Sequence, residues 1–129
     1  MEIGSAAAFE KLEVWQRSIA LVGGIYRLSR AFPNEEKFGL TAQIRRAAVS
    51  VPSNIAEGHA RKGRREFARF VSNAQGSLAE VFTQLQIASD LGFITASDAR
   101  TLIAEIRRVA RMLNALRQSL ISNLQSPLS

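Results

Sequence analysis

The chain of 129 residues contains no cysteine and only one histidine, His59. The lack of thiols excludes disulfides, thiolate metal sites and cysteine nucleophiles. A single imidazole cannot form the cluster that binds zinc, and we interpret His59 as a turn residue. The longest mostly apolar run, residues 19–26, is interrupted by Gly23 and Gly24. It is also far shorter than the roughly 20 residues of a membrane-spanning helix.

The N-terminus lacks the features of a secretory signal, because residues 1–8 have neither a basic segment nor a long apolar one. Hydrophobic residues make up 47% of the chain and charged residues 22%, as is typical of a folded globular protein. We therefore expect a cytoplasmic protein that does not contact a membrane. We expect one domain over residues 9–125, with a flexible extension at residues 1–8 and a flexible tail at residues 126–129.

Four segments have apolar residues at the spacing of an α-helix, and none shows the alternation of a strand. The first segment ends before Pro33, the second at Gly58 and the third at Gly92, and Thr95 begins a capping sequence, TASD, for the fourth. The connections are short, and short connections join antiparallel neighbours. The pattern predicts an all-α protein, an antiparallel up-down-up-down four-helix bundle.

The second segment has two neighbouring stripes of side chains, one apolar and one polar, each at spacings of three and four residues. With one residue of the third segment, the polar stripe comprises Arg46, Ser50, Asn54, Glu57 and Glu80. Such a stripe is either solvated surface or a helix–helix interface. Alanines on the same segment permit two backbones to approach closely, so we favour an interface that takes part in assembly. A leucine in place of Asn54 or Glu57 is then expected to disturb assembly or folding.

Pro52 lies inside the second helical pattern, where it lacks the N–H that would bond to the carbonyl of Ala48. Either the helix kinks there, or Pro52 is the first residue of a new helical segment. Gly76 lies in the middle of the third segment, at a cost of about 1 kcal/mol relative to alanine. We interpret Gly76, and likewise the Gly23-Gly24 pair, as a place where another group packs closely against the helix.

The net charge of +6 is concentrated in residues 45–69, which have seven basic side chains against Glu57 and Glu66. Five of these side chains form what we call the basic cluster: Arg61, Lys62, Arg64, Arg65 and Arg69. They are either a solvated turn or a contact for phosphate groups, which arginine binds well. No aromatic residue is interleaved for base stacking, so nucleic-acid binding here would be led by phosphate and weakly sequence-specific.

The sequence contains no arrangement of residues that predicts catalysis. His59 follows Glu57 by two residues, whereas di-iron bundles need Glu-x-x-His pairs. No glycine-rich phosphate loop and no nucleophile elbow is present. We expect a protein that is not an enzyme and that needs no cofactor and no metal.

Residues 43–58, QIRRAAVSVPSNIAEG, resemble the signature of the bacterial 23S rRNA intervening-sequence protein family, also called four-helix-bundle proteins. Three other segments resemble the family in the same order, with the sequences FEKLEVWQ (residues 9–16), FGLT (38–41) and AQGSLAE (74–80), the last leading to GFI at 92–94. The likeness spans roughly residues 9–120 and is specific in combination. Val51 stands where isoleucine is common in the family.

The resemblance implies an up-down four-helix bundle that assembles as a ring-shaped homopentamer in the bacterial cytoplasm. It implies no catalytic activity. A related fold serves diversity-generating retroelements as a basic pentamer that engages nucleic acid, which makes RNA or DNA a partner by analogy. Two hypotheses remain: an oligomer that binds nucleic acid, with RNA favoured, or a scaffolding ring that binds a protein partner and whose charge is incidental.

Overall fold

The computed structural model describes residues 9–125, and within this range the chain is helical and contains no strand. Residues 9–11 form a single turn of 3-10 helix ahead of the first α-helix. The other elements are α1 (Glu13–Ser29), the short 3-10 helix η2 (Asn34–Glu36), α2 (Leu40–Ala60), α3 (Arg64–Asp90) and α4 (Ala96–Gln125). The expected flexible segments, residues 1–8 and 126–129, lie outside the described residues.

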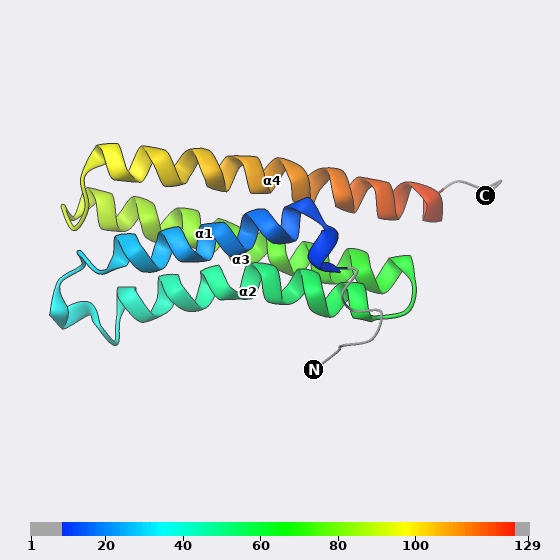
Figure 1. Cartoon of the computed structure of the whole chain (residues 1–129), viewed down its shortest axis with the longest axis horizontal. Helices are drawn as coiled ribbons and strands as arrows, with labels where there is room; N and C mark the ends of the chain where they lie inside the picture. The colour runs from blue at the N-terminus through cyan, green and yellow to red at the C-terminus, as the bar shows by residue number, and fades with distance from the viewer. Residues whose placement is uncertain (1–8, 126–129) are drawn as a thin grey trace.

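The four helices lie side by side, and each packs against two of the others (Figure 1). The pairs in contact are α1 with α2, α2 with α3, α3 with α4, and α1 with α4. The connection through η2 and the α3–α4 turn lie at one end of the molecule, and the α2–α3 turn lies at the other (Figure 1). The predicted helical segments therefore form one core, whose fully buried side chains include Ile25, Ile44, Ile55, Leu85 and Leu113.

Local sequence explains where the helices begin and end. Gly92 has a positive φ of 77°, and the N–H of Phe93 donates to the carbonyl of Ala88 at 2.9 Å, which closes the last turn of α3. The hydroxyl of Thr95 accepts a hydrogen bond from the N–H of Asp98 at 3.1 Å, which caps the first turn of α4. The predicted helix end at Gly92 and cap at Thr95 are thus confirmed.

Pro52 does not begin a new helix, so the restart predicted as one alternative is wrong. α2 runs without interruption from Leu40 to Ala60 with Pro52 inside it. Pro52 is buried and lines a groove between α2 and α1, together with Trp15 and Ile19. Pro52 is thus packed against α1, whereas an isolated helix would tolerate a proline at this position poorly.

The three glycines singled out in helices differ in what lies beside them. A Cβ added to Gly24 would be 2.9 Å from Cδ2 of Leu102, so α1 and α4 do approach closely there, as predicted. At Gly23 the nearest atom is the flexible guanidinium of Arg27. The interpretation of Gly76 is wrong within this chain: an added Cβ would meet nothing within 4 Å, and the residue is exposed.

Candidate functional site

The basic cluster lies at the end of the bundle where α2 turns into α3. Gly63 lies in the turn with φ 100°, a conformation that residues with a side chain rarely adopt. The chain thereby reverses within a few residues, and α3 begins at Arg64. All five members are exposed to solvent, so the turn brings together every basic residue that the sequence predicted for this surface.

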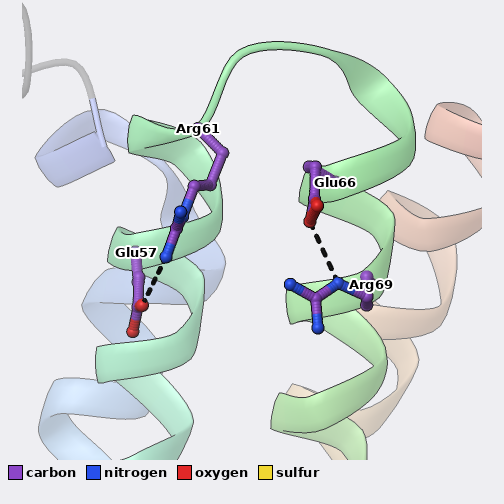
Figure 2. Close-up of polar contacts among 4 residues, drawn as sticks. All are labelled: Glu57, Arg61, Glu66 and Arg69. Carbon is purple, nitrogen blue, oxygen red and sulfur yellow. Dashed lines mark hydrogen bonds and ion pairs between the residues drawn. The ribbon is translucent and has the colours of Figure 1, made fainter.

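Two of the five basic side chains form ion pairs within their own helices. Nη2 of Arg61 lies 3.0 Å from Oε2 of Glu57, and Nε of Arg69 lies 3.0 Å from Oε1 of Glu66 (Figure 2). Such exposed pairs contribute at most about 1 kcal/mol to stability. They do, however, place a carboxylate beside each of these two cations, which reduces their attraction for an incoming phosphate.

The same two arginines lie against one aromatic ring. The guanidinium carbon of Arg61 is 5.1 Å from the centroid of Phe70, and that of Arg69 is 5.0 Å from it. Both distances are in the range of a cation–π interaction. Phe70 itself is only 7% exposed, so its ring is not offered to a nucleic-acid base. Arg61 and Arg69 therefore have a structural role in joining the end of α2 to the start of α3.

The other three members of the cluster are the better candidates for phosphate contact. Lys62 and Arg65 form no ion pair with any residue between 9 and 125. Arg64 donates one hydrogen bond from Nη2 to the carbonyl of Ser119, at 3.2 Å, which leaves its charge uncompensated and joins the start of α3 to α4. Three exposed cations thus remain at the turn.

Aromatic packing fixes this end of the bundle. The ring of His59 lies between Phe9, at a centroid distance of 6.4 Å, and Phe67, at 5.6 Å. Phe9 also packs edge-on against Trp15, at 5.3 Å. His59 is in the last turn of α2, so its interpretation as a turn residue is wrong. These contacts could not be predicted from the sequence, because the rings come from three separate segments.

The polar stripe divides into two parts. Ser50 of α2 and Ser77 of α3 are joined through their hydroxyls at 2.8 Å, and Nδ2 of Asn54 donates to both Oγ and the carbonyl oxygen of Ser50. Ser50 therefore links α2 to α3 inside one chain, and Asn54 holds the Ser50 hydroxyl from within α2. Glu57 is turned instead toward Arg61. Ser77, which lies near Glu80 on the third segment, provides the α3 side of the contact with Ser50.

A polar groove between α2 and α3 begins next to these serines. It has a volume of about 450 Å³ and is lined by residues that include Arg46, Ser50, Glu80 and Gln84. Oε1 of Gln84 is buried and has no hydrogen-bond partner among the described residues. The groove thus brings Arg46 of α2 together with Glu80 and Gln84 of α3.

The structure predicts different effects for leucine at Asn54 and at Glu57, two substitutions for which the sequence predicted the same effect. Replacing Asn54 with leucine removes two hydrogen bonds that are half-buried, so we expect the free energy of unfolding to fall by about 1 kcal/mol. Replacing the exposed Glu57 with leucine removes one surface ion pair and should change it by less than about 0.5 kcal/mol. Denaturant unfolding at one protein concentration checks both, with light scattering for the assembly. Equal losses in the two variants would contradict this division.

Two other features are absent from the described part of the chain. No three His, Asp or Glu side chains in it gather closely enough to bind a metal ion. None of its helices is long and apolar enough to cross a membrane.

The fold and the sequence were compared with known proteins. A crystal structure of a protein with unknown function from the S23 ribosomal protein family of Bacteroides thetaiotaomicron VPI-5482 is similar, with a TM-score of 0.63. The likeness covers 88% of this chain and 99% of the other at 22% sequence identity, and it shows that the fold is shared. No curated protein matches the chain. The sequence model described as 23S rRNA-intervening sequence protein matches residues 10–115. The chain therefore belongs to the 23S rRNA-intervening sequence protein family.

Proposed function

We propose that this protein is a non-enzymatic, cytoplasmic oligomer that binds nucleic acid, preferably RNA, through the phosphate groups. The observation that carries the proposal is the exposed turn with Lys62, Arg64 and Arg65, whose charges no carboxylate of the described residues neutralises. The family's association with an intervening sequence of 23S rRNA favours RNA over DNA.

Phosphate, rather than the bases, is the group that this surface fits. Arginine presents a planar fork of donors that matches the oxygens of a phosphate. The aromatic ring nearest the cluster, that of Phe70, is covered by Arg61 and Arg69 and is unable to stack on a base. Binding is therefore expected to depend weakly on base sequence and strongly on salt.

A homopentameric ring of up-down-up-down bundles is part of the proposal. The alternating positions of the three connections in Figure 1 support the up-down order. An apolar groove of about 280 Å³ between α1 and α2, lined by the partly exposed Ile19 and Val49, supports a contact between subunits. A contact of this groove with a different face of the next copy can repeat around a closed ring. Five copies of a weak phosphate contact would add by multivalency.

The experiment is a titration of RNA with the purified full chain at several salt concentrations. If about six phosphates are contacted, the affinity should fall about a thousandfold between roughly 50 and 200 mM monovalent salt. DNA of the same sequence, tested in parallel, measures the preference for RNA. An affinity for RNA that is flat over this range would overturn the proposal.

The second candidate is a scaffolding ring that binds a protein partner, and one observation favours it. Phe38 is 89% exposed on the connection between η2 and α2, and its ring lies outside the hydrophobic core. Aromatic side chains are enriched at protein–protein interfaces relative to the rest of the surface. The salt titration discriminates between the candidates, because a scaffold whose charge is incidental would show no salt-dependent retention of RNA.

A further inference from the structure

The outward face of α4 has an arginine row that the sequence count did not reveal. Arg100, Arg107 and Arg111, which we call the α4 row, are all exposed. They are spaced by seven and four residues, which places them on one face of a helix along about 16 Å of its length. None of the three forms an ion pair within residues 9–125.

The acidic residues of α4 lie off this face. Glu105 points toward α1, where Oε1 lies 3.9 Å from Nη1 of Arg17. Asp98 is in the first turn, where a carboxylate favours the helix dipole. α4 contains five arginines against these two acids. A count of charges along the sequence does not show this excess of arginine on α4, because Glu80 and Asp90 of α3 fall in the same half of the chain.

The α4 row and the free part of the basic cluster adjoin along the bundle. Arg64 donates to the carbonyl of Ser119, and Nε of Arg117 donates to Oγ of Ser72 at 2.9 Å. The start of α3 is thus held against the second half of α4. From Ser119 to Arg100 the helix rises about 29 Å, somewhat less than one turn of a B-form duplex at about 34–36 Å.

We propose that the α4 row is a second phosphate-binding surface, and that with Lys62, Arg64 and Arg65 it binds the backbone of base-paired nucleic acid. This inference rests on the proposed function and adds the form of the nucleic acid. α4 contains no aromatic residue, so its face lacks the aromatic stacking platforms of proteins that bind single strands. A straight, rigid row of arginines matches the regular backbone of a duplex, which proteins recognise by shape and phosphate contacts.

The test compares R107E/R111E with a control variant, R30E/K37E, that changes the net charge equally in the α1–α2 connection. The probes are an RNA duplex of roughly 20 base pairs and an unstructured single strand of roughly 20 nucleotides, at about 100 mM salt. We expect the wild type to prefer the duplex and R107E/R111E to bind it at least tenfold more weakly than the control. The salt slope of duplex binding should fall by about two. Circular dichroism and light scattering verify that both variants keep the fold and assembly.

The outcomes distinguish this inference from the proposed function. If the wild type binds RNA and R107E/R111E matches the control within about twofold, the α4 row is solvated surface and only the inference fails. A preference of the wild type for the single strand would also overturn it, because the row would then lack its duplex partner. If the wild type binds neither probe, the proposed function fails and the inference fails with it.

Discussion

Reversing the charge of both Arg64 and Arg65 to glutamate is expected to weaken RNA binding about thirtyfold at physiological salt. Each arginine should contribute about 1 kcal/mol through a charge-assisted contact to phosphate, and about 2 kcal/mol corresponds to this factor. Neither residue forms an ion pair within the described part of the chain, so the substitution breaks no salt bridge there. Among the described residues, the one side-chain hydrogen bond lost is the exposed one from Arg64 to the carbonyl of Ser119. The fold and the assembly should therefore persist.

Two matched variants distinguish a local contact between the turn and phosphate from a general effect of net charge. R64K/R65K keeps both charges and should lose less than about tenfold, because lysine still attracts phosphate as a point charge. R30E/K37E changes the net charge as much as R64E/R65E does, at exposed positions in the connection between α1 and α2. Filter binding or fluorescence anisotropy with labelled RNA measures all three. If R30E/K37E loses as much affinity as R64E/R65E, the turn is no more than part of a general positive charge.

Replacing Gly58 with alanine is expected to lower the free energy of unfolding by about 2 kcal/mol, although alanine normally favours a helix. The added Cβ would lie 2.6 Å from Cβ of Phe70 and 3.1 Å from Cδ1 of Phe67. A rotation of Phe70 cannot move its own Cβ, so α2 and α3 would have to separate. Overpacking of this kind costs about 1–3 kcal/mol, which exceeds the gain of about 1 kcal/mol in helix propensity.

Gly76 provides the matched control in the neighbouring helix. An alanine there meets nothing within 4 Å, so it should raise the free energy of unfolding by about 1 kcal/mol. Urea unfolding followed by circular dichroism, at one protein concentration, measures both variants. A stabilised Gly58→Ala variant would show that α2 and α3 are not in close contact at this end.

The helices could be predicted because their signals are local. The apolar period identified each helix, and Gly92 and Thr95 fixed the boundary between α3 and α4 within a few residues. Pro52 was harder, because its effect depends on burial against Trp15 and Ile19 of another helix. Gly76 and Gly58 show the same limit, since the space beside a glycine is set by whatever packs there.

The candidate site was predictable in composition but not in detail. A run of basic residues at a turn is visible in the sequence, and all five members do lie together. The ion pairs of Arg61 with Glu57 and of Arg69 with Glu66 depend on side-chain rotamers. The packing of both arginines against the Phe70 ring depends on the approach of α2 to α3. The α4 row could not be recognised from the sequence, because a count of charged residues along the chain mixes residues that face in different directions.

The contact of Phe9 with Trp15 has a practical consequence for measuring this protein. Trp15 is the only tryptophan of the chain, it is half-buried, and the Phe9 ring that covers its edge also packs against His59 at the end of α2. Its ultraviolet emission is therefore an intrinsic optical reporter of how the first helical turn is seated on the bundle. Because the basic cluster lies at the same end, the emission spectrum offers a label-free signal for events at that turn.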